Sequence, residues 1–318
     1  MKRCVYIILI LVSVLLLASC SAATSPAPNY KDEVTMTPMA PSLPDNGDYG
    51  ITASPYDIFK FEWNEKYQGY FVYENEGNPY DYVVIPETYN GKAVVGIGQY
   101  AFGAYSKVKI VVIPNSVTVI EFQAFNYCDY LESVTFLNES RLEIIKENAF
   151  YNCKRLNSIF IPKKVKMIGS RAFSTCPALE KIEVDENNAY YSDIDGNLYS
   201  KDGKLLICIA PTFMDELPSE SLKPDDNIGN ISVPEITVPE GVVAIADGAF
   251  RDCEGIGRIY IPTSVKSIGS TVIGPNVTEI VFAGTTEEWN AIKKETKWDE
   301  KAQDYVVICT NGTITKAE

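Results

Sequence analysis

Short runs of alternating apolar and polar residues recur along the chain. Three of them read LESVTF (131–136), LNSIFI (156–161) and LEKIEV (179–184), and they are rich in β-branched residues. Alternation with a period of two is typical of strands that bury one face. An aliphatic-proline pair closes several such runs, as at Ile161-Pro162 and Ile261-Pro262. Because proline has no N–H to donate to a ladder, it predicts the end of each strand.

A second motif recurs between these strands. An Ala-Phe pair places phenylalanine at Phe102, Phe125, Phe150, Phe173 and Phe250. The spacings are 23, 25, 23 and 77 residues, and the last equals one 23-residue period plus 54 inserted residues. A unit of about 23 residues cannot bury its apolar face alone, so stacked units must share one core. The pattern predicts a leucine-rich-repeat solenoid in which Phe125, Phe150 and Phe173 form one buried ladder.

The remainder of each unit completes the consensus L-x-x-I-x-I-P-x-x-V-x-x-I-G-x-x-A-F-x-x-C. Its V-x-x-I stretch predicts a second, weaker strand on the opposite side. GSRAFSTC (169–176) fits one helical or 3₁₀ turn, with Ser170 as the N-cap. Within the inserted residues, Asp195-Gly196 and Asp202-Gly203 predict the turns of a β-hairpin. The string DIDGN (193–197) lacks the glycine at position 6 and the glutamate at position 12 of an EF-hand calcium loop.

These motifs resemble the BspA-like class of leucine-rich repeats, which is found on bacterial surface proteins. The resemblance runs from about residue 56 to 314: YDYVVIPETYNGKAVVGIGQYAF looks like the first repeat, 187–211 like the inserted hairpin, and 280–292 with 305–314 like the C-terminal cap. It implies a β-rich α/β solenoid, a right-handed superhelix with parallel strand ladders, short helical or 3₁₀ turns and an inserted β-hairpin. The expected boundaries of the repeat domain (56–314) are an N-terminal cap at about 56–84, repeats at 85–184, a hairpin insertion at 185–237, repeats at 238–279 and a C-terminal cap at 280–314.

The first twenty residues carry the pattern of an export signal. Two basic residues precede the apolar run 5–17, and Leu17-Ala18-Ser19-Cys20 resembles the bacterial lipobox, whose cysteine is diacylglycerol-modified. The apolar run is shorter than the roughly 20 residues of a transmembrane helix. We predict a lipoprotein signal peptide (1–19), lipidation at Cys20, and a flexible Pro-rich tether over 20–55. An ordinary cleaved signal peptide, with Cys20 incidental, is the alternative.

Composition narrows the chemistry further. The chain has no histidine, which removes Ser-His-Asp and Cys-His nucleophile activation. Its net charge of -14, without a Lys/Arg cluster, disfavours nucleic acid as a partner. No cofactor, metal site or catalytic residue is predicted, and the chain is not expected to be an enzyme. Carboxylates such as Glu287-Glu288 and Asp215-Glu216 keep one alternative open, a carbohydrate-processing or accessory lipoprotein that uses a carboxylate pair near the hairpin.

Four cysteines occupy one column of the repeat, three residues after a repeat phenylalanine. They are Cys128, Cys153, Cys176 and Cys253. Tyr105 takes this place in the first copy, which suits a packing position. Stacked side chains point into the core in parallel, whereas a disulfide needs converging Cβ atoms. We predict four free, buried and inert thiols; a bridge involving Cys208 or Cys309 stays open.

The outward positions of the predicted strands form the face on which solenoids commonly bind partners. These positions are Lys109, Ile110, Val112, Glu132, Ser133, Thr135, Asn157, Ser158, Phe160, Glu180, Lys181, Glu183, Gly257, Arg258 and Tyr260. Phe160 and Tyr260 share one column and are candidate anchors, with Arg258 and Lys181 beside them. Both aromatic residues could instead lie under the inserted hairpin or simply pack on neighbouring strands.

These features together predict a lipid-anchored recognition or adhesion protein of the bacterial cell envelope, extracytoplasmic at the outer membrane or cell surface. Its expected partner is a host or bacterial surface or matrix protein, or a polysaccharide. The N-terminal lipid is its predicted membrane contact.

Overall fold

The computed structural model describes residues 53–103, 106–210, 235–251, 253 and 256–316. The predicted signal peptide and Cys20 lie outside the described residues, together with nearly all of the predicted tether. Tyr105 and the Asp215-Glu216 pair also fall outside them.

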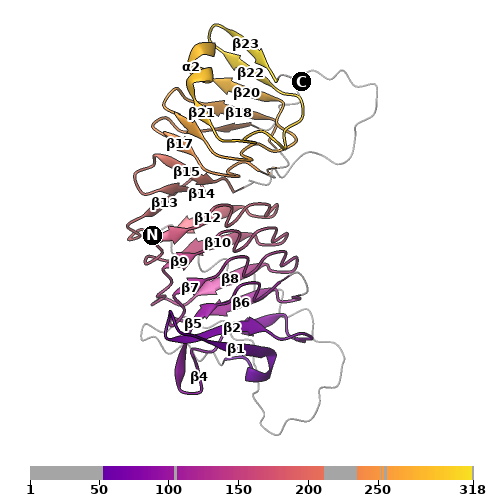
Figure 1. Cartoon of the computed structure of the whole chain (residues 1–318), viewed down its shortest axis with the longest axis vertical. Helices are drawn as coiled ribbons and strands as arrows, with labels where there is room; N and C mark the ends of the chain where they lie inside the picture. Colours follow the sequence, from indigo (N-terminus) through magenta and orange to yellow (C-terminus); the bar gives the residue numbers. More distant parts are fainter. Residues whose placement is uncertain (1–52, 104–105, 211–234, 252, 254–255, 317–318) are drawn as a thin grey trace, which may run out of the picture. The chain divides into compact units, whose positions relative to one another are not determined.

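The alternating runs form parallel strand ladders, as predicted (Figure 1). Their strands are β3 (Tyr82–Val84), β6 (Ile110–Ile113), β8 (Ser133–Phe136), β10 (Ser158–Ile161), β12 (Lys181–Val184), β16 (Glu235–Thr237), β18 (Arg258–Ile261), β20 (Glu279–Phe282) and β22 (Val306–Cys309). They pair as β3-β6-β8, β10-β12 and β16-β18-β20-β22, and β23 (Gly312–Thr315) closes the last sheet antiparallel to β22. The ladder is interrupted between β8 and β10, where the spacing of the repeat widens to 25 residues. We call the outward side of these strands the strand face.

The weaker strands form a second set of ladders. The first sheet has the order β1 (Phe59–Asn64), β2 (Gly69–Glu74), β5 (Lys92–Ile97), β7 (Val119–Ile120), β9 (Ile144–Ile145) and β11 (Met167–Ile168), with β4 (Thr88–Tyr89) paired to β5. Later copies are β17 (Ala244–Ile245), β19 (Ser267–Ile268) and β21 (Lys293–Lys294). The Tyr73 ring on β2 covers Gly98 so closely that a Cβ at this position would overlap the ring. Glycine is therefore required here if the ring is to keep its place.

Turns, not helices, lead from the second ladder back to the strand face. GSRAFSTC forms consecutive turns in place of the predicted helical or 3₁₀ turn, so Ser170 caps no helix. Arg171 (φ 56°) and Thr175 (φ 63°) flank the buried Ala-Phe pair in left-handed backbone conformation. Residues with positive φ cannot continue a right-handed helix. The helices of the described residues are η1 (Tyr56–Ile58) and α2 (Thr286–Ala291).

The predicted phenylalanine ladder is confirmed. Phe125, Phe150 and Phe173 are buried, as is Phe102. Their rings stack with centroid separations of 5.0, 4.9 and 5.6 Å and interplanar angles of at most 14°. The alanine before each phenylalanine is equally buried. The small residue lets neighbouring turns approach, and the ring fills the space between the two sets of ladders.

An antiparallel layer interrupts the stack of repeats. It consists of β13 (Tyr191–Ile194), β14 (Asn197–Ser200) and β15 (Leu205–Cys208), and β15 then pairs in parallel with β17. Asp195 (φ 50°) with Gly196 and the loop containing Gly203 (φ 69°) form the two predicted turns. Within this layer, Leu198 belongs to the core of the repeats before it, and the adjacent Tyr199 belongs to the core of the repeats after it. The interior therefore consists of two cores that meet at the insertion.

The C-terminal segment closes the second core. Thr285 and Glu288 form a capping box at the start of α2, and Trp289 on that helix is buried. Trp298 and Tyr305 continue the aromatic cluster, and the Lys294 ammonium lies 4.4 Å from the Trp289 ring centroid. Both tryptophans therefore help to cover the C-terminal end of the second core. No helix in the described part of the chain has the length and apolarity needed to cross a membrane.

Candidate recognition surface

Two of the four candidate residues lie before the insertion. Phe160 on β10 is 41% exposed, and its register partner on β12 is Glu183. Lys181 is next to Ser158 in the same register, and its Nζ lies 2.8 Å from Glu183 Oε1. The Lys181-Glu183 ion pair therefore flanks the exposed ring. The exposed ring is thus placed beside a charge pair that is already satisfied within the strand ladder.

The inserted hairpin contacts β12 without covering Phe160. Ile182 N donates to Gly196 O at 2.7 Å, and Val184 N donates to Asp193 Oδ1 at 3.0 Å. These bonds pair the free edge of β12, which would otherwise present N–H groups to solvent. The alternative that Phe160 packs beneath the hairpin is wrong.

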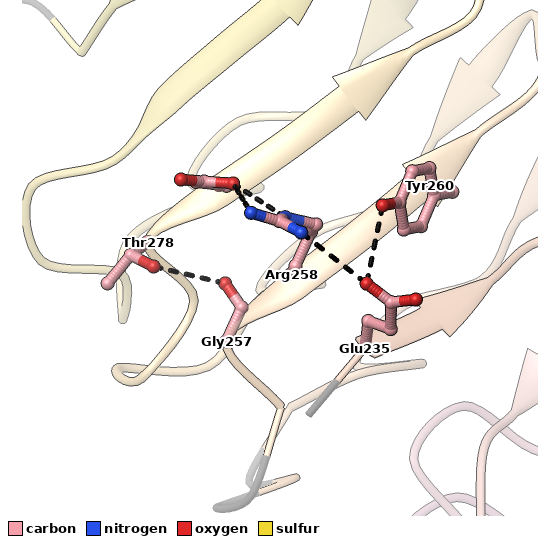
Figure 2. Close-up of polar contacts among 6 residues, drawn as sticks. Glu235, Gly257, Arg258, Tyr260 and Thr278 are labelled. Atoms are coloured by element: carbon pink, nitrogen blue, oxygen red, sulfur yellow. Dashed lines mark hydrogen bonds and ion pairs between the residues drawn. The ribbon is translucent and has the colours of Figure 1, made fainter. Parts of the chain in front are cut away.

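The other two candidates lie after the insertion, on β18 (Figure 2). Arg258 Nε and Nη2 lie 2.6 and 2.5 Å from Glu279 Oε2 on β20. Its Nη1 lies 3.5 Å from Glu235 Oε2 on β16, and the Tyr260 hydroxyl donates to the same oxygen at 3.3 Å. The hydrogen bond with Glu279 raises the pKa of Arg258. Three adjacent strands thus hold one guanidinium and one phenol in fixed positions.

The insertion separates these two groups of residues. Phe160 and Tyr260 occupy the same position of the repeat, but β10-β12 and β16-β18-β20-β22-β23 are different sheets. We call them the Phe160 patch (Phe160, Lys181, Glu183) and the Arg258 patch (Glu235, Arg258, Tyr260, Glu279). The two residues thus share one column of the repeat but lie on separate sheets, because the hairpin tip occupies the edge of β12.

Two of the predicted outward residues, Val112 and Gly257, are buried. Val112 is buried, unlike its neighbour Thr135. Its other register partner, Val84 on β3, is buried as well, and the chain at Ser54 hydrogen-bonds to Val84 in both directions. Passage of the N-terminal segment along β3 therefore closes this end of the strand face.

The residues around Arg258 were not found by sequence reasoning. Glu235 stands 23 residues before Arg258 and Glu279 stands 21 residues after it. Placing β16 and β20 in register with β18 would have brought both carboxylates to the guanidinium. The spacing from Arg258 to Glu279 is 21 residues instead of 23, and no proline follows the strand that ends at Phe282, so the repeat pattern does not reveal this register.

Two small hollows near the insertion hold about 10 Å³ each, room for a single water molecule, and both are lined by Phe173 and Cys208. In the described part of the chain, no group of three or more His, Cys, Asp or Glu side chains is placed to hold a metal ion.

The carboxylates named for the enzymatic alternative have structural partners. Glu288 accepts from Thr285 N at 2.8 Å within the capping box, and Glu287 accepts from Asn311 Nδ2 at 3.1 Å. Near the hairpin, Asp202 accepts from Ser200 Oγ and Lys204 N, and the Ser200 bond is the main cause of its lowered pKa. These groups stabilise turns and a helix end.

The cysteine column is buried as predicted, and none of the six described cysteines forms a disulfide. The thiols of Cys153 and Cys176 donate at 3.1 Å to the carbonyl oxygens of Phe125 and Phe150 in the preceding repeat, and the Cys128 thiol donates to the carbonyl oxygen of Phe102. Burial raises the pKa of Cys153 and Cys176 well above the ordinary value and that of Cys208 to about 12. A thiol held protonated is a poor nucleophile.

Comparison with known families accounts for the repeats. Six copies of a profile described as "BspA type Leucine rich repeat region" match residues 83–220 and 226–291, well over half of the chain. The chain belongs to the BspA-type leucine-rich repeat family. No curated protein sequence matches it at a significant level.

Solved structures of similar fold are bacterial leucine-rich repeat proteins. The pneumococcal vaccine antigen PcpA is 19% identical, with a TM-score of 0.50 over 67% of this chain; the chain covers 65% of the PcpA structure. A leucine-rich repeat protein of T. pallidum is 21% identical, with a TM-score of 0.43 over 72% of this chain and 81% of its own. A leucine rich cell surface protein of Faecalibacterium prausnitzii is 18% identical, with a TM-score of 0.38 over 77% of this chain and 98% of its own.

Proposed function

We propose that this BspA-type protein is a lipid-anchored recognition protein of the bacterial cell envelope that binds a protein or polysaccharide through its strand face. The Arg258 patch is the observation that carries the proposal. Its guanidinium and phenol are held by two carboxylates from neighbouring strands, so little side-chain freedom is lost when a partner binds. Tyrosine and arginine are also the residues most enriched among binding hot spots.

The Phe160 patch supplies a second contact on the same side of the repeats. Its phenyl ring is exposed on a rigid ladder, where the fold does not require an aromatic side chain. Thr135 and Thr237 stand at the equivalent position of other repeats. A partner large enough to reach past the inserted hairpin could contact both patches.

A binding array of matrix proteins and polysaccharides tests the strand face. Phe160→Thr and Tyr260→Thr install the residue that other repeats carry at this position, and should weaken binding of every array hit by about tenfold or more. Met167→Thr is the matched control, because it removes an equally exposed apolar side chain from the second ladder. The proposal would be overturned if Phe160→Thr and Tyr260→Thr both bound the array hits as tightly as the wild-type protein does.

Attachment to the membrane is tested separately. Replacing Cys20 by Ala should release the protein from membranes and abolish incorporation of a labelled fatty acid, because the acyl chains supply the hydrophobic burial that anchors it. Cys4→Ala, next to the apolar run, is the matched control and should retain the label. Labelling of the Cys20→Ala protein would contradict the lipobox interpretation.

A further inference from the structure

The strand β23 is the outermost strand of the C-terminal sheet β16-β18-β20-β22-β23 (Figure 1). Among the described residues its strand partner is β22 alone. Gly312, Thr313 and Thr315 are exposed, and Ile314 is half-buried against the second core. We call the side of β23 that faces away from β22 the free edge. A strand edge of this kind is a template for pairing with another chain.

The register of β23 decides which backbone groups face the free edge. In an antiparallel pair, hydrogen-bonded positions alternate with positions whose N–H and C=O groups point away from the partner strand. Lys316 N donates to Tyr305 O at 3.1 Å, so Lys316 is at a hydrogen-bonded position. Thr315, one residue earlier, and Thr313 are therefore at the outward-pointing positions. Their two N–H donors and two C=O acceptors face the free edge and have no partner among the described residues.

Two other sheet edges in the described part of the chain are protected, whereas β23 is not. The hairpin pairs the edge of β12, and the edge strand β1 carries the exposed charges of Lys60 and Glu62. Charged side chains on an edge strand discourage pairing with another chain. β23 has no charged residue and no proline. The next residue, Lys316, is turned back over the Tyr305 ring, where its Nζ donates to Ala302 O at 2.7 Å.

The free edge is self-complementary. Residues 313–315 read Thr-Ile-Thr, which is the same in both directions. When a second copy of β23 lies antiparallel to the first, with a two-fold axis at Ile314, Thr313 of each copy is opposite Thr315 of the other. Both of these pairs exchange two N–H···O=C bonds, so four bonds form. Paired threonines are favourable across a ladder, and the two Ile314 side chains bury each other on the core side.

We propose that two copies of this chain associate through β23, in an antiparallel pairing that joins their C-terminal sheets edge to edge. The symmetric pairing satisfies every outward-pointing group of Thr313 and Thr315 in both copies. A contact centred on a four-residue strand is smaller than the roughly 800 Å² per partner of a standard interface. The dimer is therefore weak, with a dissociation constant above about 1 μM.

The pairing also determines how the two strand faces are placed. Thr313 is in register with Ile308, whose side chain is exposed on the strand face. Since the two-fold axis is perpendicular to the joined sheet, the strand faces of both copies point to the same side. The dimer thus presents two Arg258 patches to one partner, and a partner with repeated sites gains avidity. This consequence rests on the proposed function, whereas the dimer itself does not.

Sedimentation equilibrium measures the association. The parent chain for this test runs from residue 20 onward and carries Cys20→Ala, which excludes association through acyl chains. It should be monomeric at about 1 μM and increasingly dimeric toward about 1 mM. Thr313→Pro removes an outward N–H, and with it two of the four bonds, without removing a bond to β22. It should raise the dissociation constant at least about tenfold.

Two further variants control for effects on folding. Thr313→Val is the matched control, because it keeps the N–H and the side-chain shape, and it should dimerise like the parent chain. Thr315→Pro removes the other outward N–H and should weaken the dimer as Thr313→Pro does. Both proline variants should melt at the same temperature as the parent chain at about 1 μM, where all of them are monomers.

Hydrogen exchange resolved to single residues tests the geometry of the contact. The amides of Thr313 and Thr315 should exchange rapidly in the dilute monomer and slowly at high concentration. The amide of Ile314 bonds to β22 and should be protected at both concentrations.

Three results would overturn the proposal. The first is a parent chain that stays monomeric up to about 1 mM. The second is proline variants that dimerise like the parent chain. The third is slow exchange of Thr313 and Thr315 in the dilute monomer, which would show that another part of the same chain covers the free edge. Because Phe160→Thr and Tyr260→Thr leave β23 untouched, failure of the strand-face proposal is measured separately.

Discussion

Removal of one ring from the phenylalanine ladder should lower stability more when the ring stacks on both sides than when it stacks on one. Phe150 is fully buried and stacks on both sides, against Phe125 at 4.9 Å and Phe173 at 5.6 Å. Phe150→Ala should therefore lower the free energy of unfolding by about 3–5 kcal/mol. Phe102 is buried in the same core but stacks on Phe125 alone among the described residues. Since one aromatic pair contributes about 0.5–1.5 kcal/mol beyond burial, Phe102→Ala should cost less by that amount.

Urea unfolding followed by circular dichroism measures this difference. Both variants should keep the slope of the transition and shift its midpoint, with the larger shift for Phe150→Ala. If alanine unfolds the protein outright, Phe150→Leu and Phe102→Leu preserve most of the burial and still compare two-sided with one-sided stacking. A Phe102 variant that loses as much stability as the Phe150 variant would show that the stacked rings contribute only through their buried area.

Other predictions follow from close packing and burial. Gly98→Ala should destabilise by about 1–3 kcal/mol, because its Cβ would collide with the Tyr73 ring, whereas Gly103→Ala, with 3.7 Å to its nearest atom, should be tolerated in thermal melts. Alkylation of the native protein should spare the four buried thiols of the column, which are Cys128, Cys153, Cys176 and Cys253. Denaturation without reductant should make all four reactive. A disulfide between any two of them, seen by mass spectrometry, would refute the argument that their side chains point into the core in parallel.

The repeat itself could be predicted from the sequence because its signals are local and repeated. Period-two alternation, the strand-ending proline and the Ala-Phe pair each recur, so a single ambiguous copy is corrected by its neighbours. The turn at GSRAFSTC was predicted less well. Nothing in the string reveals that Arg171 and Thr175 adopt positive φ, because these residue types do so only where the shared core over-determines the backbone.

The candidate surface could be predicted only as single residues. Alternation identifies Phe160, Lys181, Arg258 and Tyr260 as outward-facing, but it does not show which of them share a sheet. The hairpin at 191–208 was recognised from the sequence, but its role as a layer between two cores was not. That role arises because Leu198 packs into the core before the hairpin and Tyr199 packs into the core after it. The covered Val112 likewise depends on where the chain at Ser54 passes, which no local pattern encodes.

The two cores also have a consequence for the order in which the chain acquires structure. Among the described residues, the first core uses none beyond Ala210, because β14 and β15 supply its last side chains. A chain that emerges amino-terminus first can therefore complete this core and seal it with the antiparallel layer before the later repeats have been synthesised. The layer then already presents three side chains of the second core, Tyr199, Leu206 and Ile209, and the later repeats can pack against them. The insertion is in this sense both the last element of one folding unit and the first of the next.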